Sequence, residues 1–208
     1  GEGENVLIKL IDGKSVLDER VIIKKNGAII AGKPGQYVKI EEGTPVDFDY
    51  ICSIFPDFMK YTDGYVGVQT KRGCPYGCLF CLYNFIDGEK VRFRRPKVIA
   101  AEMESLVKNY GVKSIWFVDS QFYPSPQSES IVEETLDEII RRDLQLKWSS
   151  YLRIDRLTPS LAKKMLDSGI SDFELSITSG SQKVVDVLRL GFKLEQFLSA
   201  CQLLKEAG

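Results

Sequence analysis

The sequence predicts an α/β protein whose parallel sheet curls into part of a (β/α) barrel. Short apolar runs alternate with longer amphipathic runs from residue 61 onward. Each short run precedes a helix-length run, which gives about four β-then-α units in series. The chain has 208 residues, of which 44% are hydrophobic, so it can bury one full core. These three observations together indicate the fold class.

The individual elements follow from their patterns and end signals. One helix carries Ile99, Met103 and Leu106 on one face and ends at Gly111. Thr158 and Pro159 are start signals for a second predicted helix. The predicted strands span residues 65–70, 114–118, 148–154 and 173–177. The predicted helices span residues 96–110, 128–142, 159–169, 182–190 and 194–206.

Residues 1–60 are predicted to form a small helix–hairpin linker region before the barrel, which we assign to residues 61–208. A helix is expected over residues 5–11. Residues 21–24 and 28–31 flank Asn26-Gly27, a strong hairpin signal. Because the series of βα units stops after four, we expect the chain to be part of a longer protein whose last strands are absent.

Three cysteines, Cys74, Cys78 and Cys81, form a C-x3-C-x2-C run in which Phe80 precedes the last member. Thiolates are the ligands of iron–sulfur clusters, and three of them leave one iron of a four-iron cluster open. Structural zinc normally takes four ligands, and this chain has no histidine. A disulfide is disfavoured by the odd number of cysteines. A [4Fe–4S] cluster is therefore the preferred interpretation.

This run, in the loop after a strand, resembles the cluster motif of the radical S-adenosylmethionine (radical SAM) superfamily. The resemblance implies a partial barrel of six βα units with the cluster at its mouth. It also implies that the open iron binds the methionine group of S-adenosylmethionine. One electron then cleaves the sulfonium and yields a 5′-deoxyadenosyl radical, which is chemistry that the cofactor performs.

The same resemblance implies contacts to S-adenosylmethionine at the strand ends. They include Phe80, Asp119 and Gln121. Ser149 and Arg153 share one face of the third strand, and an Arg fork suits a carboxylate. A surface ion pair of Arg153 with Asp155 or Asp172 is an equal alternative.

At the fourth strand, Thr178 stands where the family often has a glutamate, which puts the usual pose of the cofactor in question. Thr178 and Ser179 are the candidate contacts here, and Ser179 could equally be a helix N-cap. No catalytic residue can be assigned.

Several features before the cysteines resemble the cobalamin-binding subclass of this superfamily. They are the Gly-Glu-Gly-Glu start and the stretch over residues 46–58. The resemblance implies cobalamin, bound mainly by a domain outside this chain, and methyl transfer to an unactivated carbon or phosphorus. Cyclisation or rearrangement, methylthiotransfer, an iron–sulfur electron-transfer or sensing module, and an inactive scaffold are the alternatives. Only Cys52 precedes the triad, which argues against the second cluster of a methylthiotransferase.

Partners and compartment follow from charge and from the family. A net charge of −1 gives no basic field for nucleic acid, and no apolar run is long enough for a membrane. We expect a cytoplasmic protein, a small-molecule or peptide substrate, and an external electron donor such as a flavodoxin or ferredoxin. The basic string over residues 92–97 could steer an anionic substrate or contact a phosphate of a cofactor, but a solvated helix start is the preferred interpretation. Tyr83 and Phe85 could wall the cluster or pack into the core, and core packing is preferred. Cys52 and Cys201 are interpreted as structural.

Overall fold

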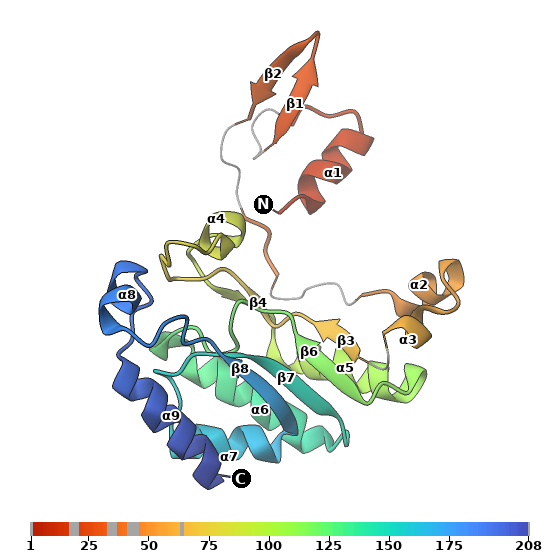
Figure 1. The fold of residues 1–208 in the computed structure, drawn as a ribbon. Coiled ribbons are helices and arrows are strands. Elements are labelled where there is room, and N and C mark those ends of the chain that lie inside the picture. The colour runs from red at the N-terminus through yellow and green to blue at the C-terminus, as the bar shows by residue number, and fades with distance from the viewer. Residues whose placement is uncertain (1, 17–20, 33–36, 41–45, 63–64, 208) are drawn as a thin grey trace.

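The computed structural model describes residues 2–16, 21–32, 37–40, 46–62 and 65–207. Its centre is a four-stranded sheet with the order β3-β6-β7-β8, and every neighbouring pair is parallel. The sheet confirms the predicted fold class (Figure 1). Its strands are β3 (Tyr65–Val68), β6 (Ser114–Phe117), β7 (Lys147–Leu152) and β8 (Ile170–Leu175).

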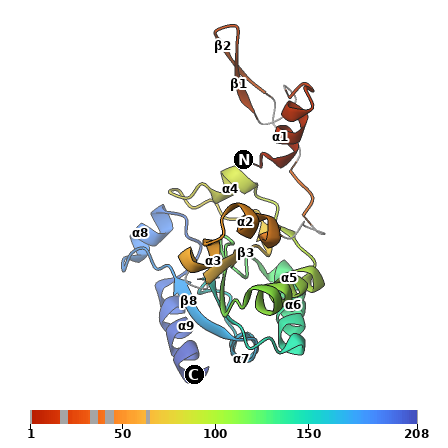
Figure 2. The ribbon, with the colours of Figure 1, turned by 90° about the vertical axis from the view of Figure 1, so that its right-hand side faces the viewer.

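Helices pack side by side along the sheet, in the order α5, α6, α7 and α9. In Figures 1 and 2, α7 lies below the strands and α4 lies above them, and Figure 2 shows α9 on one side of the strands and α5 and α6 on the other. These helices are α4 (Tyr83–Asp87), α5 (Pro96–Tyr110), α6 (Glu129–Arg142), α7 (Pro159–Asp167) and α9 (Leu194–Ala207). A short helix, α8 (Gln182–Val187), precedes α9, and a 3-10 turn, η1 (Pro126–Ser128), precedes α6.

The main core lies between the sheet and these helices. Alternate strand residues point into it, as the buried positions of β3 and β6 show. Phe117, Phe122 and Trp148 form its aromatic centre, with ring centroids 5.0–5.3 Å apart. Ile99, Met103 and Leu106 of α5 are fully buried against it, as their spacing predicts.

Some strand limits differ from the predictions for local reasons. β8 begins at Ile170, earlier than predicted, directly after Gly169. Gly169 has a φ of +95°, and a Cβ there would lie 2.5 Å from the Leu146 carbonyl oxygen. β3 stops at Val68, short of residue 70, because the Thr70 amide donates to the Asp119 carboxylate instead of to a strand.

The N-terminal region contains α1 (Glu4–Ile11) and a hairpin of β1 (Ile22–Lys25) and β2 (Ala28–Ala31). Both were predicted, and Asn26 and Gly27 have the positive φ values of a tight hairpin turn. Gly1 lies outside the described residues. Two further helices, α2 (Phe48–Ile54) and α3 (Phe58–Tyr61), were not predicted. The boundary at residue 60 stays a prediction.

Three expectations about single side chains are wrong. Arg94 is not solvated: it is buried and pairs with Glu102 at 2.6 Å. Tyr83 and Phe85 are exposed and lie outside the core. Cys201 is exposed on α9. Among the described residues, no helix is long and apolar enough to cross a membrane.

Candidate cofactor site

A small hairpin closes the loop that carries the three cysteines. Its strands are β4 (Lys71–Arg72) and β5 (Arg92–Phe93), which pair antiparallel on either side of the loop. Gly73 has a φ of +95°, and a Cβ there would lie 2.4 Å from the Lys90 carbonyl oxygen. The Cys74 amide donates to the Gly88 carbonyl at 2.9 Å. Only glycine allows the two ends of the loop to approach this closely at its base.

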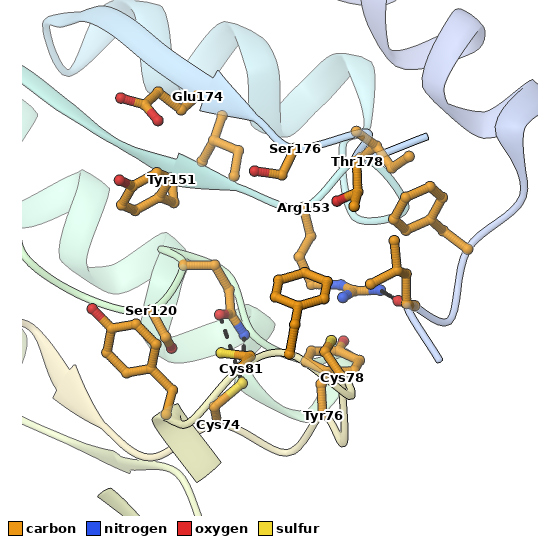
Figure 3. Close-up of a pocket in the computed structure, with 17 residues that line it drawn as sticks. Cys74, Tyr76, Cys78, Cys81, Ser120, Tyr151, Arg153, Glu174, Ser176 and Thr178 are labelled. Atoms are coloured by element: carbon orange, nitrogen blue, oxygen red, sulfur yellow. Dashed lines mark hydrogen bonds between the residues drawn. The ribbon is translucent and has the colours of Figure 1, made fainter. Parts of the chain in front are cut away.

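All three cysteines line one pocket of about 290 Å³ (Figure 3). Cys74 is buried, and Cys78 and Cys81 are half-buried. The rest of the wall comes from residues after β6 and at the ends of β7 and β8. The carboxyl ends of parallel strands are where such sheets carry ligands. The structure thus places the predicted cluster ligands at the expected edge of the sheet.

The cysteines have the chemistry of soft-metal ligands. Burial raises the pKa of the Cys78 thiol, while the Arg153 charge opposes this rise and the Cys74 and Cys81 charges add to it. Three neighbouring thiolates repel one another, so a positively charged metal group is needed to hold them deprotonated together. All five cysteines of the chain are free thiols.

The arrangement of the cysteines fits a cluster better than a single ion. Among the described residues, no three His, Cys, Asp or Glu side chains converge closely enough to hold one metal ion. A cluster binds each thiolate through a different iron, so its ligands need not meet at one atom.

Four of the predicted cofactor contacts line the pocket: Phe80, Gln121, Arg153 and Thr178. The Gln121 amide lies within hydrogen-bonding distance of Cys74 Sγ, at 3.7 Å from its nitrogen. Thr178 has a φ of +62°, which is rare for a β-branched residue. Backbone strain of this kind is concentrated at functional sites.

Arg153 lies just beyond the end of β7 and points into the pocket. Its Nε donates to Asp155 at 2.8 Å, and Nη2 donates to the Leu190 carbonyl at 3.2 Å. Its guanidinium stacks 3.7 Å from the centroid of the Tyr76 ring. The ion pair of Arg153 with Asp155 is therefore confirmed, and it holds the guanidinium at the pocket wall. Contact of Arg153 with the carboxylate of S-adenosylmethionine stays a prediction.

The other predicted contacts lie elsewhere. Ser149 is fully buried, and its hydroxyl hydrogen-bonds the Tyr65 hydroxyl at 2.6 Å. Ser179 Oγ accepts from the Ser181 amide at 3.1 Å, but the N-cap residue of α8 is Ser181, so the helix N-cap alternative for Ser179 is wrong. Neither residue is among those that line the pocket. Their contact with S-adenosylmethionine stays a prediction.

Asp119 is also buried away from the pocket. Its carboxylate accepts hydrogen bonds from the Thr70 and Lys71 amides at 3.0 and 3.2 Å, and from the Thr70 hydroxyl. Burial raises the pKa of Asp119, while Lys71 and these hydrogen bonds oppose the rise. In this structure, Asp119 fixes the start of the cysteine loop to β6.

Several pocket residues were not found from the sequence. Glu174 and Ser176 share with Thr178 the alternate positions of one strand edge, a signal that was present. The remaining missed side chains come from the cysteine loop, from β7 and the residues after it, and from the segment before α9: Tyr76, Tyr151, Leu152, Ile154, Leu190 and Phe192. Tyr83 also lines the pocket, in agreement with its alternative interpretation as a wall of the cluster, and Ser120 lines it between Asp119 and Gln121.

Residues 68–208 match the family described as the Radical SAM superfamily. The chain belongs to this superfamily. It is 26% identical over its full length to an uncharacterized methyltransferase from Pyrococcus horikoshii. It is 27% identical over its full length to an anaerobic magnesium-protoporphyrin IX monomethyl ester cyclase from Cereibacter sphaeroides. The chain spans 46% and 35% of these proteins, respectively.

Solved structures share the fold. The radical S-adenosylmethionine methyltransferase TsrM from Kitasatospora setae, solved with tryptophan and a cofactor analogue, matches the whole chain with a TM-score of 0.76 and 20% identity. The cobalamin-dependent radical enzyme OxsB matches 98% of it with a TM-score of 0.77 and 19% identity. The chain spans 43% and 31% of these two proteins. At this identity the similarity shows the fold.

Membership of the superfamily implies a [4Fe–4S] cluster and S-adenosylmethionine as cofactors. The donor set of this chain fits both groups. Cys74, Cys78 and Cys81 supply three thiols to one pocket, and Arg153 places a cation there that suits a carboxylate. The chain is thus part of a radical SAM protein.

Proposed function

We propose that this chain is the cluster- and S-adenosylmethionine-binding part of a cobalamin-dependent methyltransferase that acts on an unactivated carbon or phosphorus centre. The observation that carries the proposal is the match of 100% and 98% of the chain, N-terminal region included, to TsrM and OxsB, respectively. Methylornithine synthase, by contrast, matches 72% of the chain with a TM-score of 0.51. The relative from Pyrococcus horikoshii, named a methyltransferase, supports the same reaction class.

In this proposal, the chain's residues divide the work of holding the cofactors. Cys74, Cys78 and Cys81 hold the cluster, whose open iron supplies one-electron cleavage of S-adenosylmethionine when both are bound. Arg153 binds the methionine carboxylate, because its stacking on Tyr76 leaves a preorganised cation at the wall. The apolar wall excludes water from the reacting groups.

Thr178 takes the place of the usual glutamate as a neutral hydrogen-bonding partner for the ribose. Its left-handed backbone supports this role, since a strained β-branched residue persists only where the surroundings fix it. Thr178→Gly relieves the strain, which is about 1 kcal/mol or more. We therefore expect Thr178→Gly to leave folding stability unchanged or higher and to weaken S-adenosylmethionine binding. Isothermal titration of the reconstituted protein measures the affinity, and Thr178→Ser, which keeps the hydroxyl, is the control.

The proposed partners follow from this chemistry. Cobalamin is bound mainly outside this chain, in a region that precedes residues 1–60. The substrate is a small molecule or peptide. The electron comes from an external one-electron donor such as a flavodoxin or ferredoxin.

A second candidate is a methylthiotransferase, favoured by 22% identity to a putative methylthiotransferase from Methanocaldococcus jannaschii. The product distinguishes the two. The full-length protein, reconstituted with iron and sulfide, is incubated anaerobically with its candidate substrate and S-adenosylmethionine labelled in the methyl group. We expect labelled product only when cobalamin is present. Product that forms equally without cobalamin overturns the proposal, and a methylthio product supports the second candidate.

A further inference from the structure

Lys71 is a charged side chain with an unusual position at the start of the cysteine loop. It lies on β4 and is only 2% exposed. Its ammonium donates to the Ser120 hydroxyl at 3.1 Å. Ser120 in turn lines the pocket of the three cysteines (Figure 3). The charge of Lys71 therefore lies directly behind the pocket wall.

The described residues offer this ammonium little compensation. Ser120 Oγ is its only hydrogen-bond acceptor among them, although an ammonium has three donors. It also forms no direct ion pair with a carboxylate of the described residues. Burying a charge costs several kcal/mol unless an anion offsets it. A buried lysine with one neutral partner indicates that a further anion belongs nearby.

The charges that face Lys71 define where that anion lies. Burial lowers the pKa of Lys71, and the charges of Asp119, Cys74 and Asp87 oppose this decrease. The Asp119 carboxylate accepts from the Thr70 hydroxyl and from the amides of Thr70 and Lys71, and it forms no hydrogen bond or ion pair with the Lys71 ammonium. Cys74, by contrast, is a pocket residue and a proposed cluster ligand. Within the described part of the chain, the positive charge of Lys71 therefore lacks a neighbouring anion on the side that faces the pocket.

We propose that Lys71, held by Ser120, is a positioning charge that favours the reduced, more anionic state of the cluster bound by Cys74, Cys78 and Cys81. The inference rests on the proposed cluster site. Reduction adds one electron from the donor to the cluster and breaks no bond. Cluster potentials depend on nearby charge and solvent exposure, and a cation in a buried, low-dielectric position acts strongly.

Arg153, the other cation at this site, differs in kind. Its charge is balanced by Asp155 at 2.8 Å, and its side chain reaches into the pocket where a substrate or cofactor can contact it. Lys71 is not among the residues that line the pocket, so it reaches no ligand directly. Lys71 therefore acts on the reduction equilibrium and not on cofactor binding.

The test is a redox titration of the anaerobically reconstituted protein with dithionite, followed by paramagnetic resonance. Lys71→Met keeps the length and apolar stem of the side chain and removes the charge. We expect the reduction equilibrium to fall about tenfold, which corresponds to a midpoint about 59 mV more negative for one electron. Lys90→Met is the matched control, because Lys90 lies in the same loop but is exposed to solvent. Its midpoint should stay at the wild-type value.

A second variant controls for a folding defect in Lys71→Met. Lys71→Met/Asp119→Asn also removes the opposite buried charge, so no unpaired charge is left in the core. Its midpoint should still lie below wild type, because Thr70 holds the carboxylate away from the pocket while Ser120 holds the ammonium at its wall. A wild-type midpoint in the double variant, or equal shifts in Lys71→Met and Lys90→Met, overturns the role of Lys71. Failure of the wild-type protein to assemble a cluster overturns the proposed function as well.

Discussion

The cysteine loop is attached to the rest of the molecule on two sides, and the two attachments differ in kind. On the sheet side, the backbone of Thr70 and Lys71 is bound by the Asp119 carboxylate, all within the buried core. On the N-terminal side, Arg72 and Arg92 of the β4–β5 hairpin form ion pairs with the N-terminal segment. The first attachment is part of folding, whereas the second ties the loop to a region outside the sheet.

The N-terminal attachment centres on Glu2, whose side chain is only 5% exposed. Its carboxylate contacts Arg92 at 2.6 Å and Arg72 at 3.6 Å, and accepts from the Val38 amide. Arg92 also donates to the Val38 carbonyl and stacks near the Tyr37 ring. The Gly-Glu-Gly-Glu string thus contributes to the cysteine loop through its two glutamates. Because no core residue takes part, we expect its loss to affect the loop and not the sheet.

The sheet-side attachment gives the largest expected effect. Asp119→Ala leaves the Thr70 and Lys71 amides and the Thr70 hydroxyl without their acceptor. Buried donors left without a partner cost about 1–3 kcal/mol. We expect the free energy of unfolding, measured by chemical denaturation without iron, to fall by that amount. Asp172→Ala, at an exposed position of the same sheet, is the control and should change it by less than about 0.5 kcal/mol. Equal losses in the two variants would contradict the role of Asp119.

The N-terminal attachment gives an intermediate effect of a different type. Glu2→Ala removes the acceptor of Arg92 and of the Val38 amide, which weakens the closed loop by about 1 kcal/mol. The reconstituted protein should therefore release iron to a chelator about fivefold faster than wild type. Unfolding of the sheet, followed by denaturation without iron, should change little. A large loss of global stability with unchanged iron release would show that the two attachments are not distinct.

Acidification should abolish the difference in iron-release rate between the wild-type protein and Glu2→Gln. Burial raises the pKa of Glu2, but hydrogen bonds from Arg92 and Val38 and the charges of Arg92 and Arg72 outweigh it, so the pKa lies below its ordinary value of 4.5. The stabilisation is present above pH 4.5 and is lost as the pH falls through the lowered pKa. The gap in iron-release rate between wild type and Glu2→Gln should be full above pH 5 and shrink in stronger acid. A gap that widens on acidification contradicts the assigned charge state.

Glu4 should give the smallest effect. It pairs with Arg72 at 2.6 Å, but about half of its side chain is exposed to water. Exposed ion pairs contribute about 0–1 kcal/mol. Glu4→Gln should therefore release iron at close to the wild-type rate. A rate as high as that of Glu2→Ala would mean that burial does not separate the two glutamates.

The sequence predicted the parts of this molecule that repeat or that have local signals. The strand–helix alternation gave the sheet, and the spacing of Cys74, Cys78 and Cys81 gave the cluster site. Within the basic string over residues 92–97, the solvated interpretation failed for Arg92 and Arg94, whose partners the local pattern does not indicate. Arg94 is buried against Glu102, and Arg92 binds Glu2 across the chain. Such pairs depend on tertiary contacts that no local pattern contains.

The same dependence on tertiary contacts explains why only some of the residues predicted at the strand ends line the pocket. Gln121 and Arg153 line the pocket as expected, since Arg153 directly follows β7 and Gln121 lies in the segment after β6. Asp119, although adjacent, turns to the backbone of Thr70 and Lys71, because the loop amides there need an acceptor. Sequence position therefore selects the edge of the sheet, while unsatisfied backbone groups decide which side chain reaches the pocket.

The most direct test of the central claim is paramagnetic resonance of the anaerobically reconstituted and reduced protein, with and without S-adenosylmethionine. The account predicts a four-iron signal that changes when S-adenosylmethionine is added, because the three cysteines leave one iron open. It also predicts that Cys78→Ala loses most of its iron. A signal that S-adenosylmethionine does not alter, or iron content that Cys78→Ala leaves unchanged, would contradict the account.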